Sequence, residues 1–164
     1  MRIRSRMAGA IAIAGVLAGV LVAGASASTA ATSSPAGPAP PRLVCTLKIY
    51  NQTPTKLSGF SFGFIKCSAP FGNGVQSSTY HATVNPKTGA ATNQGSYKNW
   101  FDTGTAFGTF SLTGRYTSPT TATFKGTVTV AGGTGAFVGA TGIGKLTCRT
   151  TDAGATSTCT AVFK

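Results

Sequence analysis

Side chains of two kinds alternate along residues 108–117 and 121–131, and this alternation limits both segments to β-strands. In the first segment the even positions hold glycine or apolar residues such as Phe110 and Leu112, whereas the odd positions hold threonine, serine or arginine. A period of two gives each strand one buried and one solvated face, as in an antiparallel sheet. No window shows a convincing helical stripe of apolar residues.

The rest of the chain also shows the pattern of short strands separated by turns. Clusters of proline, glycine, asparagine and serine mark turns between short apolar runs. A chain of many short strands without helices folds as a β-barrel or a β-sandwich. Further strands are expected near 44–50, 60–67, 78–84, 105–109, 139–148 and 157–163, with turns at 51–58, 85–89, 118–120 and 152–155.

The four cysteines fit this set of strands. Cys148 and Cys159 lie symmetrically about the last expected turn, and Cys45 and Cys67 flank the first. We therefore expect two disulfides, Cys45–Cys67 and Cys148–Cys159, each stabilising the fold by roughly 3 kcal/mol. A zinc site is the competing interpretation, but the chain has no Cys-x-x-Cys pair, so no metal is expected.

The N-terminal residues predict export. Three arginines precede an apolar run, and Ala25-Ser26-Ala27 offers a small-residue cleavage site, so residues 1–27 are interpreted as a secretory signal peptide. Residues 28–41, rich in proline, serine and alanine, are expected to be a disordered linker, and 42–164 to form one domain. The mature protein is then expected to be extracellular, with no transmembrane segment after cleavage.

The predicted mature chain is strongly basic. Three of the fourteen basic residues leave with the signal peptide, and the only acids are Asp102 and Asp152, so its formal charge is 11 − 2 = +9. This charge either keeps the protein soluble or attracts an anionic partner such as a cell-wall polymer. The basic residues are scattered, which argues against specific nucleic-acid binding.

Residues 130–145 are rich in glycine and raise the possibility of a phosphate-binding loop. The segment lacks the Gly-Lys-Ser/Thr of a P-loop, and a strand rather than a helix is expected after it. We therefore expect Gly132, Gly133 and Gly135 to make a tight turn, with Phe137 folding back onto the core.

Residues 126–146, "GTVTVAGGTGAFVGATGIGKL", resemble the strand–turn–strand signature of the allene oxide cyclase and dirigent β-barrel superfamily. The similarity extends over about 104–146 and implies a calycin-like, eight-stranded antiparallel barrel with an apolar interior. In plant members that interior handles oxylipins or phenoxy radicals, often in oligomers. The catalytic residues do not carry over: the cyclases use a glutamate, which this chain lacks, and Asp102 and Asp152 do not match the dirigent aspartate motifs.

Catalysis is poorly supported by the remaining side chains. Only His81 titrates near neutrality by default, and the alternation around it points it to solvent. The chain has no Gly-x-Ser-x-Gly motif for a nucleophilic serine. We therefore name no catalytic residue and expect no cofactor, although a cyclase- or dirigent-like enzyme acting by confinement stays an alternative.

Binding is the better-supported class. The primary hypothesis is a secreted, non-catalytic barrel that holds a small apolar ligand, with a fully packed interior as the alternative. A second hypothesis is a cationic envelope-binding or defensive protein, with Tyr97, Lys98 and Trp100 exposed in a hairpin loop at 94–104. Alternatively, Trp100 and Phe101 plug one barrel end. The oligomeric state is left open. The residues expected to line the interior are Phe60, Phe62, Phe64, Tyr80, Phe110, Tyr116 and Phe124.

Overall fold

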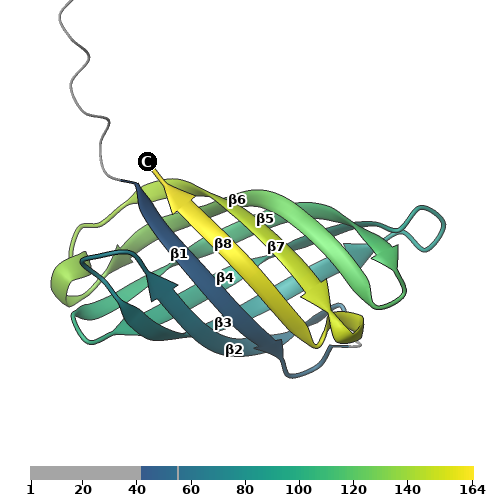
Figure 1. Ribbon diagram of the computed structural model, residues 1–164, viewed down its shortest axis with the longest axis horizontal. Coiled ribbons are helices and arrows are strands. Elements are labelled where there is room, and N and C mark those ends of the chain that lie inside the picture. Colours follow the sequence, from purple (N-terminus) through teal and green to yellow (C-terminus); the bar gives the residue numbers. More distant parts are fainter. Residues whose placement is uncertain (1–41, 55) are drawn as a thin grey trace, which may run out of the picture. The chain divides into compact units, whose positions relative to one another are not determined.

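The computed structural model describes residues 42–164 except residue 55, and these residues form a closed eight-stranded antiparallel β-barrel (Figure 1). Each strand pairs with its sequence neighbours, and β1 closes the barrel against β8. The predicted signal peptide and linker lie outside the described residues. The strands are β1 (Leu43–Asn51), β2 (Ser58–Cys67), β3 (Asn73–Val84), β4 (Ala90–Phe101), β5 (Gly104–Ser118), β6 (Thr121–Gly133), β7 (Gly142–Thr151) and β8 (Thr156–Phe163).

Both predicted disulfides are confirmed. Cys45 lies directly opposite Cys67 on β1 and β2, and Cys148 lies directly opposite Cys159 on β7 and β8. The Cα atoms are 3.9 Å apart in the first pair and 4.1 Å apart in the second. Both bridges join neighbouring strands and point into the barrel, so they fix the inward face of four strands.

Strand β4 is the main element that the sequence did not reveal. Residues 94–104 were expected to form a hairpin loop, but β4 continues to Phe101 and the turn to β5 takes only the next two residues. The expected strands at 105–109 and 108–117 are one strand, β5. Strand β4 has polar residues on both faces, with Gln94 outside and Asn93 inside, so it lacks the contrast on which the prediction depended.

The glycine-rich connection is longer than expected. Strand β6 includes Gly133, and residues 134–141 then link it to β7 through a short 3-10 helix, η1 (Gly135–Phe137). The predicted tight turn is therefore wrong. The connection lies along the β4–β5 turn, since the Ala136 amide donates a 2.9 Å hydrogen bond to the Thr103 carbonyl oxygen. The prediction for Phe137 is confirmed, because its side chain is buried.

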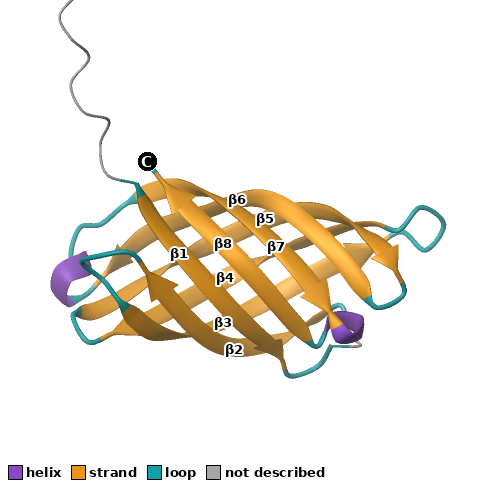
Figure 2. Ribbon diagram, viewed as in Figure 1, coloured by secondary structure: helices purple, strands orange, loops and turns teal. Residues whose placement is uncertain are grey.

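The two ends of the barrel differ. The β2–β3, β4–β5 and β6–β7 connections meet at the end that carries η1, where the Phe137 ring centroid lies 4.6 Å from that of Phe71 and 5.2 Å from that of Phe101. We call these three rings the aromatic cluster. The opposite end carries the other four connections and a second 3-10 helix, η2 (Asp152–Gly154) (Figure 2).

Candidate ligand site in the barrel lumen

The inward side chains of all eight strands surround a cavity of about 420 Å³. Its lining is mainly apolar and includes sulfur from both disulfides together with side chains such as Ile65 and Leu112. The cavity extends between the ends of the barrel, from the exposed Leu57 in the β1–β2 connection to the aromatic cluster. A volume of this size lies within the range of pockets that hold small organic ligands, about 300–1,000 Å³.

Inward-facing glycines explain why large side chains do not fill this space. Phe110 is paired with Gly95 across β4 and β5, and Phe124 with Gly114 across β5 and β6. A Cβ atom on either glycine would lie within 2.9 Å of the partner ring. Each ring therefore lies over a glycine of the neighbouring strand, against the wall of the barrel. This placement leaves the axis of the barrel free.

Two inward tyrosines donate hydrogen bonds from their hydroxyl groups to backbone carbonyl oxygens. Tyr97 donates to the Thr129 carbonyl oxygen at 3.2 Å, and Tyr80 donates to the Thr53 carbonyl oxygen at 2.9 Å. Burial raises the pKa of Tyr97 from 10.0 to about 12 because the phenolate would be poorly solvated. Tyr97 therefore stays neutral near physiological pH and serves as a hydrogen-bond donor rather than as a base.

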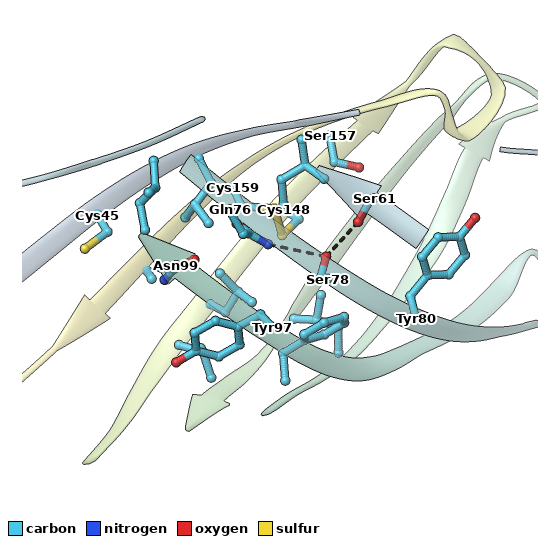
Figure 3. Close-up of a pocket in the computed structure, with 18 of the residues that line it drawn as sticks. Cys45, Ser61, Gln76, Ser78, Tyr80, Tyr97, Asn99, Cys148, Ser157 and Cys159 are labelled. Carbon is cyan, nitrogen blue, oxygen red and sulfur yellow. Dashed lines mark hydrogen bonds between the residues drawn. A yellow bond between two sulfur atoms is a disulfide. The ribbon is translucent and has the colours of Figure 1, made fainter. Parts of the chain in front are cut away.

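A compact group of buried polar side chains lies on the part of the lumen wall formed by β2, β3 and β4 (Figure 3). The Ser61 and Ser78 hydroxyls share a 2.6 Å hydrogen bond, and the Gln76 Nε2 group donates to Ser78 Oγ at 3.4 Å. Asn99 lies directly opposite Gln76 in the β3–β4 register. We call Ser61, Gln76, Ser78 and Asn99 the polar cluster.

The hydrogen-bonding capacity of this wall is not used up. The side-chain oxygens of Gln76, Asn93 and Asn99 are buried and have no hydrogen-bond partner among the described residues. Among those residues, Lys56 and Lys164 are the charged side chains that line the cavity, and both belong to segments at barrel ends. The middle of the lumen is therefore neutral, with amide groups on one part of its wall.

Four of the seven side chains predicted to line the interior do so: Tyr80, Phe110, Tyr116 and Phe124. The prediction is wrong for the three phenylalanines of β2, which point outward. Phe60, Phe62 and Phe64 are 47%, 45% and 60% exposed. Strand β2 has apolar residues on both faces, so its alternation left the direction open. The signal that could have settled it is Cys67: an inward disulfide there places the odd-numbered residues of β2 inside.

The three residues predicted to form one surface site lie on opposite faces of the barrel wall. Tyr97 is buried in the lumen, so its assignment to the surface is wrong, and no hairpin loop holds it. Lys98 and Trp100 lie on the outside, with Lys98 Nζ 5.3 Å from the Trp100 ring centroid. The alternative, in which Trp100 and Phe101 plug one barrel end, is wrong for Trp100, which is 38% exposed, whereas Phe101 does lie at one end in the aromatic cluster.

Exposed apolar side chains on the neighbouring strands lie beside the outward phenylalanines of β2. Phe64 is paired with Val75, and Val75 with Trp100. Lys48 lies opposite Phe64 on β1. We call the exposed set Phe60, Phe62, Phe64, Val75 and Trp100 the outer aromatic face.

The groups weighed for catalysis do not converge. His81 is exposed, and its Nδ1 atom lies 2.7 Å from Ser58 Oγ. Asp102 follows β4 at the end with the aromatic cluster, whereas Asp152 lies in η2 at the other end. In the part of the chain that the structure describes, no group of three or more His, Cys, Asp or Glu side chains could hold a metal ion. Across the same residues, no helix has the length and apolar character needed to span a membrane.

Comparison of the chain with protein-family models, with curated proteins and with solved structures found no match.

Proposed function

We propose that this protein is secreted and that its barrel binds a small, largely apolar molecule in the lumen. The observation that carries the proposal is the cavity of about 420 Å³ with a mainly apolar lining. Aromatic rings that lie over glycines of neighbouring strands leave the axis of this cavity free. Apolar concave sites with a few polar groups are the usual form of small-molecule sites in proteins.

Binding accounts for the lumen better than catalysis does. Besides Lys56 and Lys164 at barrel ends, the lumen residues with hydrogen-bonding side chains are amides, hydroxyls and three tyrosines, and burial raises the pKa of one of these, Tyr97, to about 12. Tyr97 therefore keeps its proton near neutral pH, and side-chain amides and aliphatic hydroxyls do not act as general acids or bases in this range. The resemblance to allene oxide cyclases and dirigent proteins leaves room for an enzyme that guides a reactive substrate by confinement alone, which is the alternative form of the proposal.

Secretion is supported by two features. The two disulfides are typical of proteins that fold in an oxidising compartment. The N-terminal sequence has the pattern of a cleavable signal peptide. Expression in a secreting host, followed by N-terminal sequencing of the mature protein, tests this part; a mature chain that retains Met1 would contradict it.

Displacement of a fluorescent apolar probe tests lumen binding. We expect the probe to bind the native protein and Val130→Trp, which places an indole in the lumen, to weaken this binding. Thr127→Trp is the matched control, because it makes a similar change on the outward face of the same strand. Equal probe binding by native protein and both variants would contradict a lumen site.

A second candidate function is binding to an anionic cell-wall polymer. It is favoured by the outer aromatic face, near which Lys48 and Lys98 lie within 6 Å of the Tyr50 and Trp100 ring centroids. Aromatic rings beside cations suit stacking on sugars combined with charge attraction. Salt-dependent co-sedimentation with isolated cell wall, lost in the double variant Lys48→Gln/Lys98→Gln, would support it. Retention unaffected by salt and by these substitutions would contradict it.

A further inference from the structure

We infer that the lumen ligand is a neutral molecule that presents a hydroxyl or amide group to the polar cluster on β2–β4. The inference rests on the proposed lumen binding and names the chemical class of the ligand. It depends on a different observation, namely the unused hydrogen-bonding capacity of buried amides. It can therefore fail while lumen binding stands.

The amides of Gln76 and Asn99 are the central observation. Their residues are 6% and 8% exposed, and they face each other across the β3–β4 register. Gln76 Oε1 and Asn99 Oδ1 have no hydrogen-bond partner among the described residues. Buried polar atoms are normally paired, because the loss of hydration otherwise opposes folding. Two adjacent amides that leave this requirement unmet on a cavity wall indicate a ligand that meets it.

The neighbouring serines bind Gln76 without satisfying its side-chain oxygen. The Ser61 and Ser78 hydroxyls are engaged with each other at 2.6 Å. Ser78 also accepts a long hydrogen bond from Gln76 Nε2, which uses the nitrogen of that amide rather than its oxygen. Figure 3 shows Gln76 and Asn99 side by side within the lumen. The register places Asn99 opposite Gln76, and the side-chain oxygens of both lack a partner among the described residues.

A hydroxyl is the group that fits this pair best. A hydroxyl donates to a side-chain oxygen and accepts from a side-chain nitrogen, so it pairs with an Asn or Gln amide in either orientation. A neutral amide on the ligand has the same two capacities. An ether or a hydrocarbon end cannot donate and would leave Gln76 Oε1 and Asn99 Oδ1 unpaired.

The charges of the lumen argue against an acid. The charged lining residues of the described chain, Lys56 and Lys164, lie in segments at barrel ends rather than in the polar cluster. A carboxylate at Gln76 and Asn99 would be buried without a counter-ion, and ionised groups avoid such a setting. Two amide groups cannot replace the hydration of a full charge. The inference therefore selects an alcohol, phenol or amide over a fatty acid.

Asn93 adds a second contact point for long ligands. It lies on β4 six positions before Asn99, about 20 Å away at the usual rise per residue, and its Oδ1 atom is also unpaired within the described chain. Between these points Tyr97 lies on β4, and the facing position on β5 that enters the lumen with a large side chain is Phe110. An elongated apolar body with a polar group at one or both ends matches this order.

The experiment is a displacement series on the native protein, using the fluorescent apolar probe as reporter. Tetradecan-1-ol, its methyl ether and tetradecanoic acid are matched in chain length and differ in the end group. At pH 7 we expect the alcohol to bind about tenfold more tightly than the ether, the ratio that one unpaired buried polar group is worth. We expect the acid to bind no better than the ether.

A double variant locates the preference. Gln76→Met/Asn99→Leu removes both amides while keeping side-chain volume close, and it should reduce the preference for the alcohol over the ether to about twofold or less. Gln94→Met, on the outward face of β4, is the control and should keep the preference. Circular dichroism and disulfide mapping would show that both variants are folded. A preference that survives the double variant would overturn the assignment to these amides.

The outcomes separate the two proposals. Equal binding of alcohol and ether by the native protein, or tightest binding of the acid, would overturn the inference while leaving lumen binding in place. Binding of the probe that is unaffected by Val130→Trp would mean that the proposed function itself fails.

Discussion

The Tyr97 hydroxyl donates a 3.2 Å hydrogen bond to the backbone carbonyl oxygen of Thr129, which lies two strands away on β6. The ring reaches that oxygen by crossing Gly108 of β5, with which Tyr97 is paired in register. A Cβ atom on Gly108 would lie 3.1 Å from the Tyr97 hydroxyl oxygen and still closer to the Thr129 carbonyl. The glycine thus allows an aromatic side chain to lie against the wall rather than across the lumen.

Substitution of Gly108 should therefore disturb both stability and lumen volume. We expect Gly108→Ala to lower the free energy of unfolding by about 1–3 kcal/mol, because the new methyl group meets a backbone carbonyl and a ring that cannot both move away. Urea denaturation followed by circular dichroism measures the change. Gly142→Ala is the control, since a Cβ atom there meets nothing within 4 Å, and it should change stability by less than about 0.5 kcal/mol. Equal effects of the two substitutions would contradict this explanation.

The disulfides should contribute unequally. Loss of Cys148–Cys159 through the double Cys→Ala variant should cost roughly 3 kcal/mol, because it releases a constraint on the unfolded chain. Cys45–Cys67 spans 22 residues rather than 11, and each doubling of a loop adds about 0.6 kcal/mol on the loop-entropy model. Denaturant midpoints of the two double variants test this order. A larger loss for the Cys148–Cys159 variant would indicate that effects in the folded state dominate.

Burial of the Tyr97 phenol makes the free energy of unfolding depend on pH in the alkaline range. The pKa of Tyr97 is raised by burial from 10.0 to about 12, so between these values the unfolded chain loses this proton while the folded protein keeps it. The unfolded state then binds fewer protons, and stability falls as pH rises. The contribution of Tyr97 is at most about 1.4 kcal/mol per pH unit.

Comparison with Tyr97→Phe isolates this contribution. The variant should lose about 1 kcal/mol at pH 7 with the Thr129 hydrogen bond, and its stability should then fall less steeply than that of the native protein between pH 10 and 12. Urea denaturation at several pH values provides the measurement. Parallel pH profiles for the two proteins would show that the Tyr97 phenol is not desolvated in the folded state.

Two phenylalanines test the direction of the strand faces. Phe124 is buried inside the barrel, so Phe124→Ala should cost about 3–5 kcal/mol. Phe62 is 45% exposed on the outside, and Phe62→Ala should cost less than about 1 kcal/mol. Thermal and urea unfolding of both variants would check this. A large loss for Phe62→Ala would mean that the outer aromatic face is covered in solution.

Much of the fold was readable from the sequence because its signals are local. The alternation at 108–117 and 121–131 marked β5 and β6, and both disulfide pairs followed from the symmetry of cysteines about expected turns. Strand β4 was not recognised, because Gln94 and Asn93 on adjacent positions give its two faces the same polar character. A strand of this kind is defined by its neighbours, which supply its hydrogen bonds and burial.

The lumen site was only partly predictable. Four of the expected lining residues reach the cavity, but the amides of Gln76 and Asn99 drew no attention in the sequence, since isolated polar residues in a strand usually face solvent. Their position became meaningful only through the β3–β4 register, which pairs residues 23 positions apart. No local pattern in either strand contains that information.

The sequence by itself determined the strand period, most of the turns and the cysteine pairs, because each depends on the order of residues over one or two neighbouring strands. Only the tertiary structure decided that Phe60, Phe62 and Phe64 point outward and that the barrel keeps a lumen. Closure of β1 on β8 fixes one inward face for every strand at once, and the register then sets large rings over glycines such as Gly95 and Gly108. Whether the interior is filled therefore depends on cross-strand pairs, whose members lie apart in the chain.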